Sequence, residues 1–221
     1  MIGIICALAI EVNEYLKILK NRQDLKILGK TFYQGTINNK ECVLTICGIG
    51  KVEAGITTTL LLEHFPQVDL IINSGIAGAY DTNLKTLDTI FGVKVGCYDI
   101  DMVLDGLPFG CFKKEERFFT NKLKTPLGTI PGIIMTSDCF AGDRCKLTAI
   151  FNEHYPNEAI SCVDMESYVI CQMAERHHLN WVVVRTISDI VGETDQLSTY
   201  YNFPEQASQK SFKIIVNNFL Q

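Results

Sequence analysis

The chain has 221 residues, of which 47% are hydrophobic and 20% charged, and its formal net charge at pH 7 is −5. This length suffices for one sizeable core but not comfortably for two, so a single domain over residues 1–221 is expected. The acidic balance argues against binding to nucleic acids, which requires a basic face. The opening residues 1–5 lack a basic n-region and no apolar run reaches membrane-spanning length, so we expect a cytoplasmic protein that does not enter a membrane.

Strands and helices alternate along the chain. Apolar runs and alternating patterns predict strands at residues 2–6, 26–36, 41–47, 68–73, 89–95, 130–136 and 181–187. Helical spacing predicts helices at residues 9–20, 51–65, 144–154, 165–178 and 203–220. The glycine-rich segment 74–78, directly after the strand at 68–73, is predicted to be a turn. The segment from 97 to 128 is the least regular and indicates loops. This order predicts an α/β fold, a single-domain three-layer αβα sandwich with a mixed, mostly buried central sheet.

The nine cysteines are a high and odd number. None is spaced Cys-x-x-Cys, and no pairing with the four histidines has zinc-finger spacing. We therefore expect free, mostly buried thiols in a reducing compartment and no metal site.

The segment Gly48–Glu53 begins like a dinucleotide-binding fingerprint. Its third glycine position holds Glu53, whose bulk and charge oppose close helix packing and a pyrophosphate. It does not fit a P-loop either, because Thr45 replaces the first glycine and Val52 replaces the Ser or Thr after the lysine. No nicotinamide, nucleotide or metal cofactor is therefore expected.

Three acidic residues, Glu11, Glu166 and Asp189, lie where predicted strands meet predicted helices. Taken singly, Glu11 and Glu166 suit the first turn of a helix, and Asp189 suits an N-cap or a turn. Ligands of open α/β sheets bind at the edge where such strands end, so the three carboxylates together indicate a site for a polar small molecule.

Six short motifs around these residues resemble those of bacterial methylthioadenosine/S-adenosylhomocysteine nucleosidases, in the purine nucleoside phosphorylase/nucleosidase superfamily. They are Ile4–Val12, Gly48–Val52, Ile72–Gly78, Ser137–Phe140, Val163–Glu166 and Val183–Asp189. They follow the family order and extend over nearly the whole chain.

The resemblance implies hydrolysis of the N-glycosidic bond of an adenine nucleoside. Asp189 would be the general acid at purine N7, and Glu11 the general base for water. An ordinary Asp has a pKa of about 3.9, so the site must raise the pKa of Asp189 or share its proton with the purine.

The resemblance also implies nine substrate-binding residues. Glu166 would bind the ribose hydroxyls, Met165 would pack on the sugar, and Arg185 would help to hold Glu11 and the water. Phe140 would stack on the base, the backbone of Ala141 would read the purine edge, Ser188 would orient Asp189, and Ile49, Ala77 and Gly78 would shape the pocket. Phe140 and Met165 could instead be core residues. Tyr200, Tyr201 and Phe203 are equally compatible with an aromatic wall for the 5′ substituent and with packing before the last helix.

Ile76 departs from the family pattern, because the resemblance implies a Ser or Thr there whose hydroxyl contacts the catalytic carboxylate region. The sequence of the segment Gly75–Ala79 resembles futalosine hydrolases, which release hypoxanthine, more closely. Asp189 favours a 6-amino purine instead, because a 6-oxopurine is usually met by Asn.

Two other functions stay open. A phosphorylase would need a cationic phosphate site, but the first strand ends in Glu11 with no Arg. A non-catalytic nucleoside-binding protein would not need Glu11. The resemblance further implies a homodimer, with Asp99–Leu107 as the candidate interface segment.

Overall fold

One mixed sheet of ten strands forms the centre of the computed structural model, which describes all 221 residues. The strands are β1 (Ile2–Cys6), β2 (Lys20–Ile27), β3 (Lys30–Ile37), β4 (Lys40–Ile46), β5 (Leu70–Ala79), β6 (Thr89–Cys97), β7 (Phe118–Thr120), β8 (Ile130–Thr136), β9 (Ile160–Asp164) and β10 (Asn180–Ile190). Their order is β10-β6-β8-β9-β5-β1-β4-β3-β2, and β7 pairs with β6 outside this path.

The sheet closes on itself around β5. This strand pairs in parallel with β1 and β10 and also meets β9 in an antiparallel pairing at Gly78 and Ala79. Because β10 also pairs with β6, the strands β5, β10, β6, β8 and β9 form a ring. The last long strand of the chain is therefore hydrogen-bonded beside a strand from its first half.

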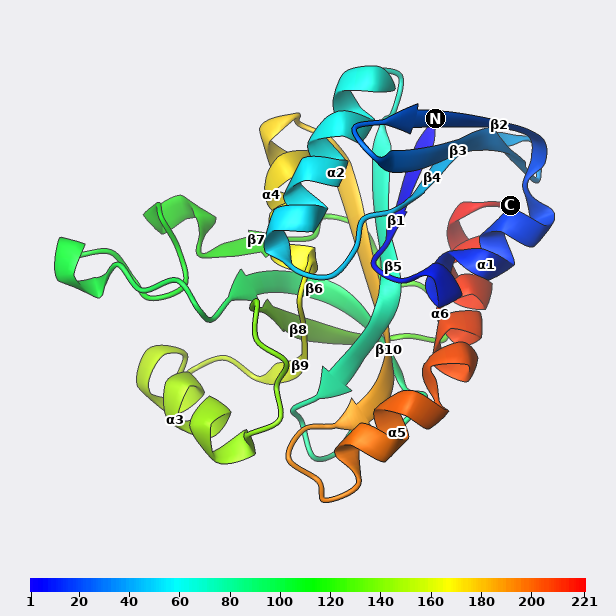
Figure 1. Ribbon diagram of the computed structural model, residues 1–221. Helices are drawn as coiled ribbons and strands as arrows, with labels where there is room; N and C mark the ends of the chain where they lie inside the picture. The colour runs from blue at the N-terminus through cyan, green and yellow to red at the C-terminus, as the bar shows by residue number, and fades with distance from the viewer.

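Six helices cover the sheet from both sides (Figure 1). They are α1 (Ala9–Ile18), α2 (Lys51–His64), α3 (Arg144–His154), α4 (Ser167–Arg176), α5 (Gln196–Asn202) and α6 (Pro204–Phe219). Helices α1 and α6 pack together on one face, and α2 and α4 pack together on the other. The predicted three-layer α/β arrangement with a mixed sheet is confirmed.

The core lies between these layers. Its largest cluster, which includes Ile71, Val183 and Leu61, fills the space between the sheet and the α2/α4 layer. Tyr15, Ile215 and Val184 belong to the cluster beneath α1 and α6. Seven of the nine cysteines are buried, as expected for core thiols.

Several elements differ from the sequence-based expectation. The glycine-rich segment 74–78, predicted as a turn, is the second half of β5, and β10 continues to Ile190 instead of ending before Ser188. The exposed, polar strand β2 was not predicted as a separate strand, because it has no apolar face to produce an alternating pattern. A short helix, α5, precedes the predicted last helix. None of the helices has the length and apolar composition that a bilayer crossing requires.

Candidate active site

A pocket of about 280 Å³ opens where β1, β5 and β10 end. Its walls come from the β1–α1 turn, the end of β5, the β8–α3 loop, the β9–α4 junction, the end of β10 and α5. Ten of the eleven predicted site residues line it, namely Glu11, Ile49, Ala77, Gly78, Phe140, Ala141, Met165, Glu166, Ser188 and Asp189.

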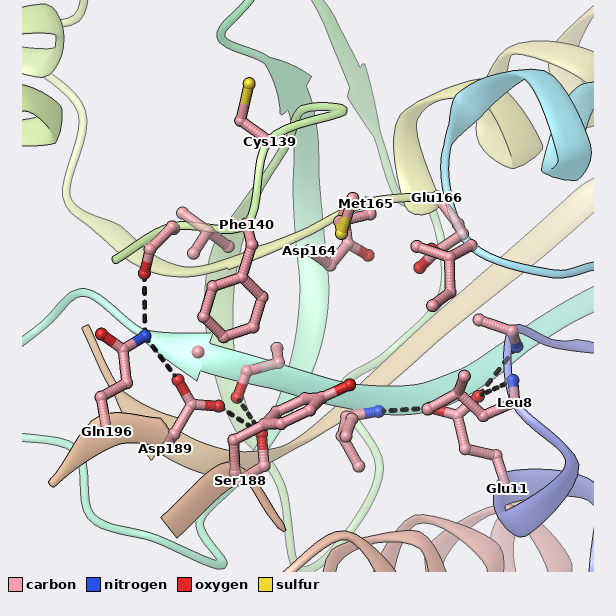
Figure 2. Close-up of a pocket in the computed structure, with 18 of the residues that line it drawn as sticks. Leu8, Glu11, Cys139, Phe140, Asp164, Met165, Glu166, Ser188, Asp189 and Gln196 are labelled. Carbon is pink, nitrogen blue, oxygen red and sulfur yellow. Dashed lines mark hydrogen bonds between the residues drawn. The ribbon is translucent and has the colours of Figure 1, made fainter. Parts of the chain in front are cut away.

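Asp189 lies at one end of the pocket, at a bulge in β10 (Figure 2). Its Oδ1 accepts a hydrogen bond from Ser188 Oγ at 2.5 Å, and its Oδ2 accepts one from Gln196 Nε2 at 2.8 Å. Burial raises the pKa of Asp189, while these two donors oppose the rise by favouring the ionised form. The environment therefore moves this carboxyl in the direction that a general acid requires.

Glu11 lies at the opposite end of the pocket, in the first turn of α1 (Figure 2). Its Oε2 accepts hydrogen bonds from the backbone N–H groups of Ala7 and Leu8 at 2.8 and 2.9 Å. Its Oε1 accepts one from the backbone N–H of Ile76 at 3.0 Å. Burial raises the pKa of Glu11, while the positive charge of Arg185 and the three N–H donors oppose the rise. The main chain of Ile76 thus contacts the carboxylate where the resemblance implied a side-chain hydroxyl.

Glu166 is the N-cap residue of α4 and is also buried. Its Oε1 accepts a hydrogen bond from the backbone N–H of Gly50 at 3.0 Å. Burial, together with the neighbouring charge of Asp164, raises the pKa of Glu166 to about 7, although Arg185 opposes the rise. Gly50 has a φ of +94°, a conformation that favours glycine, so a glycine at this position allows the backbone to meet the carboxylate.

Arg185 is the predicted site residue that does not line the pocket. Its side chain is buried behind the wall and forms an ion pair with Asp164, with 2.7 Å between Nη2 and Oδ2. It also donates to Asn73 Oδ1 at 2.6 Å and lies 3.6 Å from Glu166 Oε2. It makes no direct ion pair with Glu11, although its positive charge acts to lower the pKa of that carboxyl. From its buried position outside the pocket lining, the guanidinium stabilises the negative charges of Glu11 and Glu166.

Gly75 permits this arrangement. A Cβ atom at this position would lie 2.6 Å from Arg185 Nη1 and 2.7 Å from Glu11 Oε1. Any other residue would therefore push apart two charged groups of the site.

The four aromatic residues considered for the pocket wall occupy different positions in the structure. Phe140 lines the pocket and packs edge-to-face with Tyr200, with ring centroids 5.4 Å apart. Tyr200 also lines the pocket, whereas Tyr201 is exposed and Phe203 caps α6. Of the three candidate wall residues, Tyr200 alone belongs to the pocket wall.

A polar cluster anchors the loop that carries Phe140. Asp138 accepts a hydrogen bond from the backbone N–H of Lys51 at 2.7 Å and donates its own backbone N–H to Asp99 at 2.7 Å. Lys51 Nζ lies 2.5 Å from Asp99 Oδ1. The start of α2, the segment after β6 and the β8–α3 loop are thereby tied together beside the pocket.

Sequence reasoning missed seven lining residues: Ala7, Leu8, Tyr98, Cys139, Val163, Asp164 and Gln196. All of these except Tyr98 and Gln196 lie within the recognised motifs and could have been found there. Gln196 lies in a segment without a motif, and only the path of α5 brings it to Asp189. The lining includes no Lys or Arg, and no group of three His, Cys, Asp or Glu residues is placed to hold a metal.

The family model of the phosphorylase superfamily matches residues 1–221. A 5′-methylthioadenosine/S-adenosylhomocysteine nucleosidase of Psychromonas ingrahamii is 36% identical, with 98% of both chains covered. That of Haemophilus ducreyi is 33% identical, with 99% of this chain and 98% of the relative covered. This chain belongs to the phosphorylase superfamily, as a methylthioadenosine/S-adenosylhomocysteine nucleosidase type of N-glycosidase.

Solved structures agree with this membership. The nucleosidase of S. pneumoniae, solved with the transition-state inhibitor MT-ImmA, has a TM-score of 0.88 at 30% identity, with 97% of this chain and 96% of that chain covered. The nucleosidase of Colwellia psychrerythraea, solved with adenine, has a TM-score of 0.88 at 27% identity, with 98% and 93% covered. The futalosine hydrolase of Helicobacter pylori shares the fold, with a TM-score of 0.85 at 22% identity and 97% and 94% covered.

Proposed function

We propose that this N-glycosidase hydrolyses adenine nucleosides, namely 5′-methylthioadenosine, S-adenosylhomocysteine and 5′-deoxyadenosine, to adenine and the ribose derivative. The observation that carries the proposal is a pair of buried carboxylates, Glu11 and Asp189, at opposite ends of one pocket. N-glycosidic hydrolysis needs a proton donor on the base side and a water-activating group on the sugar side.

Asp189 serves as the general acid in this proposal. Protonation of purine N7 makes adenine a better leaving group, and a carboxyl with a raised pKa holds that proton closer to neutral pH. Phe140, which extends into the pocket beside Asp189, supplies a face on which the base can stack (Figure 2).

Glu11 serves as the general base for water. Its three backbone donors keep both carboxylate oxygens oriented, and their hydrogen bonds favour the ionised form that a base must have. A carboxylate at this end of the pocket also stabilises the positive charge that develops on the ribose as the bond breaks. Glu166 binds the ribose hydroxyls and Met165 packs against the sugar.

The absence of cationic side chains from the lining favours water over phosphate as the nucleophile. A phosphorylase must neutralise a phosphate, whereas this pocket presents Glu11, Asp164, Glu166 and Asp189. The relatives support the adenine nucleoside, since those solved with MT-ImmA and with adenine share the fold over nearly the whole chain.

We further propose that the enzyme acts as a homodimer. Val52 and Ile56 are exposed on α2 beside the pocket residue Ile49, which is itself half exposed. Val103 and Leu104, within the predicted interface segment, are exposed as well. Exposed apolar groups of this kind mark surfaces that bind other proteins, and a second copy of the chain is the partner that the resemblance implies.

Product analysis tests the proposal. Methylthioadenosine, S-adenosylhomocysteine, adenosine and inosine are each incubated with the enzyme, with and without phosphate, and the released base is quantified. We expect adenine release that does not depend on phosphate. Release that requires phosphate, or release from inosine alone, would contradict the proposal in favour of a phosphorylase or a 6-oxopurine hydrolase. Binding without release would contradict it in favour of a nucleoside-binding protein.

The Asp189→Asn variant tests the general acid. Asn cannot deliver a proton, so turnover should fall by about 10²–10⁴-fold while nucleoside binding persists. Near-normal turnover would remove Asp189 from that role.

A further inference from the structure

Gln196 makes a three-point contact at the base end of the pocket. It is the first residue of α5, and 6% of it is exposed. Its Nε2 donates to Asp189 Oδ2 and to the backbone carbonyl of Ala141, each at 2.8 Å. Its Oε1 accepts from the backbone N–H of Gly192 at 2.9 Å. Figure 2 shows the amide between the two oxygens.

The orientation of this amide is fixed by its partners. Gly192 presents a donor, whereas Asp189 and Ala141 present acceptors. A flipped amide would set its NH₂ group against a donor and its oxygen against two oxygens. Both N–H bonds of Nε2 are therefore committed to two acceptors that belong to the pocket wall.

The spacing of these acceptors has a chemical meaning. One nitrogen reaches Asp189 Oδ2 and the Ala141 carbonyl at 2.8 Å, so the two oxygens are placed to receive both hydrogens of a single planar NH₂ group. The 6-amino group of adenine is such a group. The 6-oxo group of hypoxanthine would meet two acceptors and be repelled.

We propose that Gln196 stands in for the 6-amino group of the base, and that adenine takes over both acceptors when it binds. This inference rests on the proposed function. The exchange replaces one NH₂ group by another, so both buried acceptors keep a donor. A buried acceptor without a donor would cost free energy. Gln196 is thus a positioning residue that holds the general acid and the purine-edge carbonyl ready for a 6-aminopurine.

The test compares adenine with purine, which lacks the 6-amino group, in the wild type and in Gln196→Met. The variant keeps the length of the side chain but loses the donors. Adenine no longer has to displace an amide from it, whereas bound purine leaves both acceptors without a protein donor. The ratio of the purine to the adenine dissociation constant, measured by calorimetry, should rise about tenfold, as expected for one hydrogen bond. Gln206→Met, at an exposed glutamine of α6, is the matched control and should leave the ratio unchanged.

An unchanged ratio in Gln196→Met, with adenine still binding the wild type, would overturn the stand-in role and leave the proposed function intact. Failure of the wild type to bind adenine would overturn both. Gln196→Asn is the second variant, in case the first does not fold. Its amide is one methylene shorter and cannot bridge the same partners, so the ratio should rise in the same direction. Equal weakening of both bases in a folded variant would show a merely structural role and overturn the inference.

Discussion

Glu11 and Asp189 are both buried carboxylates, but the donors around them differ in kind. Glu11 is held by main-chain N–H groups, which cannot rotate away or become acceptors. Asp189 is held by a hydroxyl and an amide side chain, and the hydroxyl of Ser188 can either donate or accept. Fixed donors suit a group that acts as a base, and the adaptable hydroxyl of Ser188 suits a group that must carry a proton and release it.

The Glu11→Gln variant addresses the residue that activates water. An amide cannot accept the proton of the attacking water, so turnover should fall by about 10²–10⁴-fold with the fold retained. Steady-state rates and thermal unfolding check this. Glu14→Gln, at a residue of the same helix that pairs with Lys17, is the control and should keep normal turnover. Unchanged turnover in Glu11→Gln would exclude the base role.

Glu166 should make the stability of the protein depend on pH. Burial and the charge of Asp164 raise its pKa from 4.5 to about 7, so between these values the folded chain holds a proton that the unfolded chain has lost. Its contribution to the free energy of unfolding is therefore full below pH 4.5 and is lost as the pH rises through 7.

The Glu166→Gln variant should flatten this dependence. Urea unfolding at several pH values from 4.5 to 7.5 measures the slope, and Glu205→Gln, at an exposed residue of α6, serves as the control. A slope equal to that of the wild type would show that Glu166 does not hold the proton.

Most residues that line the pocket could be predicted, because they lie in short motifs at strand ends, where the fold brings them together. Arg185 was predicted to help to hold Glu11, but its ion-pair partner is Asp164. The sequence pattern does not indicate which of several carboxylates will pair with a buried guanidinium. Gln196 could not be predicted, because its place depends on the three-dimensional course of the chain after β10.

The second half of β5 shows why a glycine-rich segment can be a strand. Glycine there predicted a turn, yet Gly75 lies in the ladder with Arg185 as its partner on β10. The glycine is needed for close approach, since a Cβ would meet Arg185 Nη1 and Glu11 Oε1. Local pattern alone does not separate these two uses of glycine.

The Gly75→Ala variant should damage stability and activity together. Overpacking of a buried site costs about 1–3 kcal/mol, and displacement of Glu11 should also lower turnover. Chemical unfolding and steady-state rates are the measurements. Gly142→Ala, beside the pocket residue Ala141, is the control, because a Cβ there meets no atom within 4 Å. Equal behaviour of the two variants would contradict the close-approach explanation.

The whole molecule should self-associate through the apolar side chains that are exposed on α2 and in the segment Asp99–Leu107. Leu104 is fully exposed in the segment predicted to form the interface, so Leu104→Asp should shift the protein from dimer to monomer, as sedimentation would show. Leu127→Asp, at another exposed leucine, beside Gly128 and near Ile214 of α6, is the control. A monomeric wild type would contradict the dimer.

The position of β10 has a consequence for synthesis of the chain. This strand lies between β5 and β6, which both leave the ribosome well before it. Until residue 190 has emerged, each of those strands presents an unpaired edge, and such edges recruit other chains. The same strand, β10, carries the proposed general acid Asp189. A nascent chain that lacks β10 is therefore both prone to aggregation and unable to catalyse the reaction. Newly made protein should therefore gain protection from aggregation and catalytic activity in the same step, when β10 pairs with β5 and β6.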